Sequence, residues 1–411
     1  MRLVGCSWSM LFGQQSTCQL AKSRHINLSG LLPPRSEKYA TIRSELPQHK
    51  PFILSSAPAY WTARRIRRPL CCFRVAISMF PLPSHDRISE LGFPPLFQVA
   101  TLRSITQLFG STKSRCGIYL LEFPQNRFYV GQAVEVVRRF AQHRKSYDEI
   151  IGFSFIPTPR TNLDELERNL IHKAEEIGLF ILNTVHASNV IGDTDLDLVI
   201  SQEEQAAWLS SPTEFNSNHA TSPIILPQAQ LERFSGKFRR FQKHHLFASA
   251  SQLLRTYLSN CVPYPRQTEY SFWVVSCLPA TNRNTWPRLL CVSAGVMELL
   301  VIGYHRDAPA NMWGFINVAS DVLSEAFATD EDIFAAFPAI EIFRRQYRDA
   351  GQHQVTLHAS DELSMKAVLE HNTVRQAAAM LALRVMRKRG TIYAKFHCKQ
   401  LADFALAENG S

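Results

Sequence analysis

The fold is constrained most by residues 116–131, which read CGIYLLEFPQNRFYVG. Two short runs of apolar and aromatic residues flank Pro-Gln-Asn, and each run carries one tyrosine, Tyr119 or Tyr129. Runs of this composition are typical of β-strands. Proline fixes φ, and asparagine tolerates the left-handed conformation that tight turns need. The pattern therefore predicts a β-hairpin that carries one tyrosine on each strand.

The residues around this hairpin predict a small antiparallel sheet flanked by helices. Helical spacing of apolar residues follows in VEVVRRFAQHRK, residues 134–145. GFSFIP at 152–157 reads as a third strand, and NLDELERNLIHKAEEIGLFILN at 162–183 reads as a helix. A short amphipathic helix is also expected before the hairpin, at residues 96–110, ending near a glycine.

Five polar side chains of this segment suit one kind of chemistry. Arg139 and His143 are four residues apart and share one helix face, while Glu167 interrupts the apolar side of the later helix. An arginine can neutralise a phosphate, and a carboxylate can hold a divalent cation. A tyrosine or histidine can move the proton. Together with Tyr119 and Tyr129, these residues suit phosphodiester cleavage.

Residues 117–119 read Gly-Ile-Tyr and residues 129–131 read Tyr-Val-Gly, and this pair resembles the GIY-YIG nuclease superfamily. The resemblance covers about residues 116–183. Arg139, ten positions after Tyr129, matches the catalytic arginine of that family, and LERNLI matches the family's "LE-x-x-LI" helix. The implied fold for this segment is a three-stranded antiparallel sheet flanked by helices, within an α+β protein.

The resemblance also implies roles for single residues. It places Tyr119, Tyr129, Arg139, His143 and Glu167 at the active site, with Tyr119 acting as or assisting the general base. Glu167 would be the protein ligand of one Mg²⁺ or Mn²⁺ ion. The remaining motif positions are Gly117, Gly131 and Asn183. Duplex or structured DNA would be the partner and substrate.

A second function class stays open, in which a GIY-YIG fold holds nucleic acid or protein without cutting it. Each matched residue taken singly has an ordinary explanation, because strand tyrosines are usually core residues and helix charges are usually solvated. The joint spacing of all of them favours the nuclease.

The formal charge of +10 is confined to one end of the chain. Residues 1–78 hold 12 Lys and Arg against two acidic residues, whereas residues 79–411 hold 33 of each. Residues 1–78 are expected to be a disordered basic arm, an organellar transit peptide, or the product of a start assigned too early, with Met79 as the true first residue. Nucleic-acid contacts after Met79 must therefore come from local clusters.

Cysteine usage and hydropathy indicate an intracellular protein. The nine cysteines are scattered without a C-x-x-C pair, so a zinc ribbon is not expected and the thiols are taken as reduced. Apolar runs long enough to span a bilayer are absent from the sequence. We expect a cytoplasmic protein that does not contact membranes, with nucleoid association in keeping with a DNA partner.

Residues 1–78 are the first of four predicted parts of the chain. Residues 79–200 form the nuclease-like domain, 201–228 a short helix and linker, and 229–411 a separate α+β domain. The last domain should contain an antiparallel meander of four strands between about 270 and 319, followed by helices at 340–349, 364–371 and 373–390.

Several basic residues on predicted helices are candidates for nucleic-acid contact. LERFSGKFRRFQKHH at 231–245 has an apolar stripe of Leu and Phe at helical spacing, with basic residues on its other faces. It is either a DNA-contacting helix or an amphipathic helix that packs on the following domain. The candidate contacts are Arg138, Arg144, Lys145, Lys237, Arg239 and Arg240.

Overall fold

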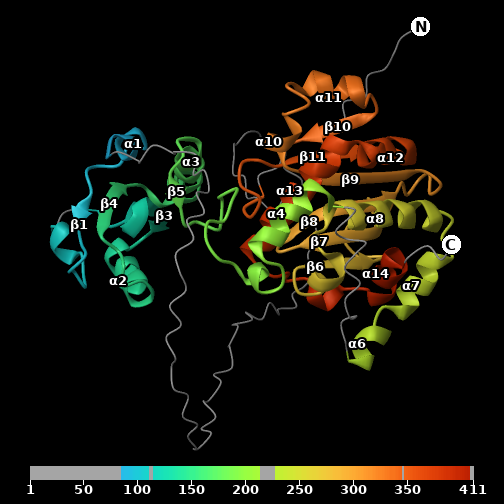
Figure 1. Ribbon diagram of the computed structural model, residues 1–411, viewed down its shortest axis with the longest axis horizontal. Coiled ribbons are helices and arrows are strands. Elements are labelled where there is room, and N and C mark those ends of the chain that lie inside the picture. Colours follow the sequence, from blue (N-terminus) through green and yellow to red (C-terminus); the bar gives the residue numbers. More distant parts are fainter. Residues whose placement is uncertain (1–84, 111–113, 213–226, 345–346, 408–411) are drawn as a thin grey trace, which may run out of the picture. The chain divides into compact units, whose positions relative to one another are not determined.

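The computed structural model describes residues 85–110, 114–212, 227–344 and 347–407 (Figure 1). The expectations for residues 1–78, and for residues 213–226 of the predicted short helix and linker at 201–228, lie outside these residues. Within them the chain is of mixed helix and strand with two mainly antiparallel sheets, in agreement with the predicted α+β class.

The first sheet contains the predicted hairpin. Its strand order is β1-β4-β2-β3-β5, with β2 antiparallel to both β3 and β4, and β3 parallel to β5. Gln125 and Asn126 form the turn with φ values of 64° and 56°, as the Pro-Gln-Asn sequence predicts. The strands are β1 (Phe97–Gln98), β2 (Gly117–Phe123), β3 (Arg127–Ala133), β4 (Gly152–Pro157) and β5 (Phe180–Ile181).

One helix covers each face of this sheet, because β2 alternates its side chains between two apolar clusters (Figure 1). Ile118 and Leu120 pack with the buried residues of α3 (Leu163–Glu176). Tyr119 and Leu121 pack with those of α2 (Val136–Ser146). This alternation directs Tyr119 toward the helix that carries Arg139 and His143.

Two predictions around this sheet were wrong. Residues 96–110 do not form a helix: Phe97 pairs with Phe153 in the β1–β4 ladder, and a 3-10 turn follows at Thr106–Leu108. The later helix ends at Glu176 rather than running to residue 183, because Gly178 adopts φ of 72° and β5 follows. In both places pairing with a distant strand outweighs local helical spacing.

The second sheet has six antiparallel strands in the order β10-β11-β9-β8-β7-β6. Strands β6 to β9, the first four along the chain, form the predicted meander. The helix expected at 340–349 is wrong, because Ile340 and Ile342 pair with Ala359 and Leu357 in a strand ladder. The strands are β6 (Trp273–Cys277), β7 (Arg288–Ala294), β8 (Met297–Tyr304), β9 (Met312–Val318), β10 (Ile340–Phe343) and β11 (Val355–Ala359).

Three helices, α8 (Phe247–Cys261), α12 (Glu362–Glu370) and α13 (Asn372–Lys388), cover one face of this sheet and form the larger core with it. Phe234, Phe238 and Phe241 are buried in the same core, which confirms the packing interpretation of the 231–245 segment. The other α-helices are α1 (His85–Glu90), α4 (Gln202–Ser210), α6 (Gln228–Glu232), α7 (Ser235–Gln242), α9 (Pro265–Thr268), α10 (Ser320–Leu323), α11 (Asp330–Ala336) and α14 (Lys399–Leu406).

A membrane crossing would need a long apolar helix, and the described part of the chain contains none that meets both requirements.

Candidate active site

The hydroxyl of Tyr119 joins three predicted site residues. The Nε of Arg139 donates a hydrogen bond to the phenol oxygen at 3.3 Å, and the same oxygen lies 2.8 Å from Nε2 of His143. Because an arginine can only donate, the phenol oxygen accepts from Arg139, while the direction of its bond to His143 depends on which imidazole nitrogen carries the proton. The three side chains thus form one chain of hydrogen bonds.

Burial shifts the pKa values of Tyr119 and His143 in opposite directions. Burial raises the pKa of Tyr119 well above its ordinary value, with a further contribution from Tyr129, so the phenol keeps its proton at neutral pH. Burial and the nearby charge of Arg139 lower the pKa of His143 to about 4. Both groups are therefore neutral at pH 7, and an imidazole whose proton is on Nδ1 can accept from the phenol at Nε2.

Tyr129 lies beside this pair. Its ring stacks on that of Tyr119 with centroids 6.2 Å apart, and its centroid is 5.1 Å from that of His143. Burial raises the pKa of Tyr129, and the negative charge of Glu167 raises it further, while Arg139 acts in the opposite direction. The two tyrosines and Glu167 thus share one electrostatic environment.

Glu167 reaches the site from α3 and is linked to the hairpin by Gln132. Nε2 of Gln132 donates to Glu167 Oε2 at 2.9 Å and also to the carboxylate of Asp164. Burial is the main reason that the pKa of Glu167 is raised. Two carboxylates therefore meet at one amide nitrogen, one helical turn apart on α3.

These two carboxylates fit a hard divalent cation. Mg²⁺ is commonly held by one or two carboxylates, with water and substrate phosphate as the other ligands. Asp164, Glu167 and the amide oxygen of Gln132 are all oxygen donors of the type that such an ion prefers. No cluster of three or more His, Cys, Asp or Glu side chains suited to a metal occurs in the described ranges. Asp164 and Glu167 are the carboxylates that would hold the ion.

The remaining motif residues shape the hairpin. A Cβ on Gly117 would lie 2.1 Å from the carbonyl oxygen of Ile156, so this position must be glycine for β2 and β4 to pair. The side chain of Asn183 donates to the Val130 carbonyl at 2.7 Å and accepts from its amide at 3.0 Å. Asn183 thus extends the edge of β3 beyond the short strand β5.

The candidate nucleic-acid contacts fall into two groups. Arg138, Lys145, Arg239 and Arg240 are exposed. Arg144 is used inside the fold, because its guanidinium donates to the carbonyls of Val99, Asp148 and Ile150. Nζ of Lys237 donates to the Leu278 carbonyl at 3.0 Å and lines a cavity.

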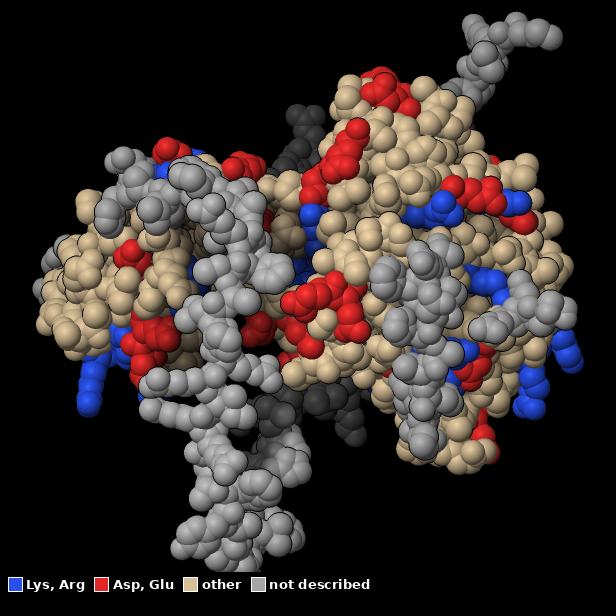
Figure 2. Space-filling view, viewed as in Figure 1, with Lys and Arg blue, Asp and Glu red and all other residues tan. Residues whose placement is uncertain are grey.

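Basic side chains do not gather into one patch on the face that Figure 2 shows, where those of the described residues are scattered among acidic ones. This distribution agrees with the charge balance of residues 79–411. Contact with a phosphate backbone would therefore depend on a few exposed residues beside the site rather than on a broad positive surface.

Sequence reasoning missed three contributors to the site. Gln132 bridges the hairpin and α3, Asp164 adds a second carboxylate, and the ring of Tyr147 stacks on His143 with centroids 6.2 Å apart. The spacing of Asp164, three residues before Glu167, is a signal that places both acids on one helix face. The role of Gln132 has no comparable signal in the sequence.

A scan of protein-family models and searches of curated proteins and of solved structures all find no match to this chain. The functional argument therefore rests on the residues and their geometry.

Proposed function

We propose that the protein is a metal-dependent endonuclease of GIY-YIG type that hydrolyses phosphodiester bonds of DNA. The observation that carries the proposal is the hydrogen-bonded chain from Arg139 through Tyr119 to His143. It stands beside Tyr129 and the Glu167 carboxylate. In this proposal residues 117–183 would supply a phosphate-binding group, a proton route and a cation ligand, as hydrolysis of a phosphodiester requires.

In this proposal Tyr119 passes a proton rather than storing a negative charge. The attacking water would give its proton to the phenol oxygen as the phenol proton moves to Nε2 of His143, and the negative charge of the bound phosphate would have to offset the burial and the Arg139 charge that disfavour the imidazolium. No tyrosinate has to form, in keeping with the raised pKa of Tyr119. Tyr119 is 1% exposed, so water would reach its hydroxyl on the side of Arg139, whose side chain is exposed.

Arg139 would act on the phosphate. Its guanidinium donates to the Tyr119 hydroxyl through Nε and to the side-chain oxygen of Gln142 through Nη1, at 3.3 Å in each case. A guanidinium held in this way is aligned to neutralise the charge that grows on the phosphoryl oxygens in the transition state. Arg138 and Lys145, exposed on the same helix, would add contacts to the DNA backbone.

Glu167 and Asp164 would hold Mg²⁺ or Mn²⁺. When bound, such an ion supplies positive charge to the phosphate oxygens and lowers the pKa of a coordinated water. The side chain of Gln132, which now donates to both carboxylates, would turn its amide to present oxygen or would give way. The counter-charge would also offset the cost of burying the Glu167 carboxylate.

Cleavage assays with the purified full-length chain test the proposal. Single-stranded, duplex and branched DNA are incubated with Mg²⁺, Mn²⁺ or EDTA, and RNA of the same forms serves as a comparison. We expect cutting of at least one DNA form that EDTA abolishes. Binding without cutting of any nucleic acid under all conditions would favour the alternative of a non-catalytic binding module. The DNA substrate would place the protein in the cytoplasm with the nucleoid, or in an organelle if residues 1–78 target it there.

A further inference from the structure

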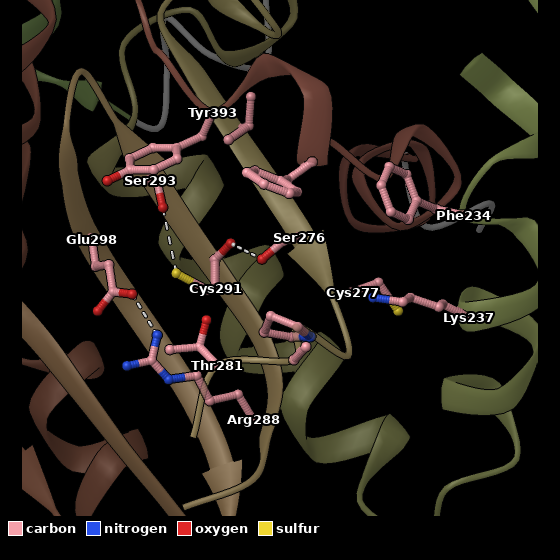
Figure 3. Close-up of a pocket in the computed structure, with 14 residues that line it drawn as sticks. Phe234, Lys237, Ser276, Cys277, Thr281, Arg288, Cys291, Ser293, Glu298 and Tyr393 are labelled. Carbon is pink, nitrogen blue, oxygen red and sulfur yellow. Dashed lines mark hydrogen bonds and ion pairs between the residues drawn. The ribbon is translucent and has the colours of Figure 1, made fainter. Parts of the chain in front are cut away.

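The second sheet carries a cavity that is independent of the proposed active site. It lies on the sheet face opposite α8, α12 and α13, over β6, β7 and β8, and has a volume of about 480 Å³ (Figure 3). Side chains from α7 and from the segment after α13 form its walls, including Lys237, Tyr393 and Phe396. A volume in this range is typical of sites for small molecules.

Strand register and a β-bulge determine which side chains form the floor. Val274, Ser293 and Glu298 are neighbours across the three strands, because Ser293 pairs with both of the others. Cys291 follows on the same face, while a register shift between Arg288 and Leu290 lets Arg288 join that face as well. The bulge therefore places an arginine inside the cavity, where a regular strand would direct it differently.

Arg288 has a donor without an acceptor among the described residues. Its side chain is 8% exposed and forms an ion pair with Glu298, yet its Nε, which is buried, has no hydrogen-bond partner. A buried N–H without an acceptor is unfavourable. A ligand with an acceptor group in the cavity would satisfy it.

The charges in and near the cavity are mainly positive. Lys237 lies at the opposite wall from Arg288 (Figure 3), and Glu298 is the carboxylate among the lining residues. Two cations against one paired carboxylate favour an anion over a cation.

Aromatic rings line the other part of the cavity. Phe234, Tyr393 and Phe396 all contribute, and the Lys237 ammonium lies 5.7 Å from the centroid of the Phe234 ring. Phe396 is 43% exposed, so part of this apolar lining is accessible from outside. Rings in this arrangement favour a planar, apolar ligand body.

We propose that this cavity binds a small organic anion that combines a planar ring with one carboxylate, phosphate or sulfonate group. The ring would lie among Phe234, Tyr393 and Phe396, and the anionic group would accept hydrogen bonds from Arg288, with Lys237 adding positive charge from the opposite wall. This binding function does not depend on the nuclease proposal, because none of its residues belongs to the first sheet or its helices.

Two fluorescent probes that differ by one anionic group test the proposal on the full-length chain. 1-Anilinonaphthalene-8-sulfonate is the anionic probe, and N-phenyl-1-naphthylamine is its uncharged relative. We expect saturable binding of the sulfonate at one site, about tenfold tighter than the uncharged probe, as one charge-assisted hydrogen bond would give. Equal affinity for the two probes would contradict a site for anions.

Paired substitutions locate the binding. Thr281→Trp places a large ring at a lining position on an exposed loop, and Thr285→Trp adds the same ring to that loop away from the lining. The first variant should lose sulfonate binding and the second should keep it. Equal binding by both variants would place the probe elsewhere and overturn the proposal.

A double substitution, Arg288→Met with Glu298→Gln, tests the charged group without leaving one charge unpaired. The double variant should bind the sulfonate and the uncharged probe with about equal affinity, while circular dichroism shows an unchanged fold. An undiminished preference would exclude Arg288 as the anion-binding group.

Indole-3-acetate and adenosine monophosphate then compete against the bound sulfonate. Displacement by the first supports a carboxylate, displacement by the second a phosphate, and displacement by neither contradicts the site.

Discussion

Gly131 lies directly beneath the hydroxyl end of Tyr119: a Cβ added to Gly131 would approach the Tyr119 oxygen to 2.4 Å. The two residues are paired across β2 and β3, so the missing side chain of one makes room for the ring of the other. The glycine is thus required by the position of the proposed proton-transfer residue, and its φ is not in the left-handed region.

Gly131→Ala should therefore displace Tyr119 and break its bonds to Arg139 and His143. We expect cleavage to fall by at least about 10²-fold, because small displacements of catalytic groups are costly. The thermal midpoint should also fall. Gly110→Ala is the control, since a Cβ there meets nothing within 4 Å. An alanine at 131 that leaves the cleavage rate unchanged would show that the position of Tyr119 is not critical.

Tyr119→Phe tests the proton route with little change of shape. The variant keeps the ring but removes the oxygen that bonds Arg139 and His143. General acid–base groups typically contribute about 10²–10⁴-fold, so the single-turnover rate should fall in that range while DNA affinity stays within about twofold. Tyr147→Phe, an exposed neighbour whose ring stacks on His143, should retain most activity. Equal rates for both variants would remove Tyr119 from the mechanism.

The buried His143 makes stability depend on pH. Its pKa is about 4 in the folded protein and about 6.5 in an unfolded chain, so the unfolded state binds more protons between these values. The free energy of unfolding should then decrease as pH falls from about 6.5 to about 4, by up to about 3 kcal/mol from this residue. Above pH 7 this contribution should be constant.

Denaturant unfolding of the wild type and His143→Gln at several pH values measures this contribution. The variant should show a shallower decline between pH 6.5 and 4. His186, whose pKa is also lowered to about 4 by burial, titrates in both proteins and cancels in the comparison. Parallel curves for the two proteins would mean that His143 is not held neutral.

Glu167→Gln tests the metal site. The substitution keeps the size of the side chain and its place beside Gln132 but removes the charge that a cation needs. We expect cleavage to be lost and Mn²⁺ binding, followed by calorimetry, to weaken at least tenfold, while the fold is unchanged. Glu165→Gln, an exposed position on the same helix, serves as the control. Wild-type cleavage by Glu167→Gln would exclude this carboxylate as the ligand.

The hairpin and its helices were predictable because their signals are local. The turn residues Gln125 and Asn126, the strand composition around Tyr119 and the helical spacing in α2 and α3 lie within short windows of sequence. Strand β1 and strand β10 were not predictable in this way. Phe97 and Ile340 are strand residues because of partners 56 and 19 positions further along the chain.

The candidate site divides in the same manner. Arg139 and His143 could be assigned to one helix face from their spacing. The contact of Gln132 with Asp164 joins residues 32 positions apart and depends on how α3 crosses the sheet. The role of Arg144 could not be predicted either, because its carbonyl partners lie in two different loops. The cavity over β6, β7 and β8 depends on a bulge and on segments far apart in sequence.

The most direct test of the account compares Arg139 variants in rate and in affinity. Arg139→Lys keeps the charge but loses the planar guanidinium, and Arg139→Ala loses both. If Arg139 stabilises the transition state, single-turnover cleavage should fall by about 10²–10³-fold in the alanine variant and by less in the lysine variant. DNA affinity should change little. Arg138→Ala, one position earlier and exposed, should instead weaken binding and lower the salt dependence by about one charge. A wild-type protein that cuts no nucleic acid with either metal, combined with Arg139 variants that change affinity alone, would contradict the nuclease assignment.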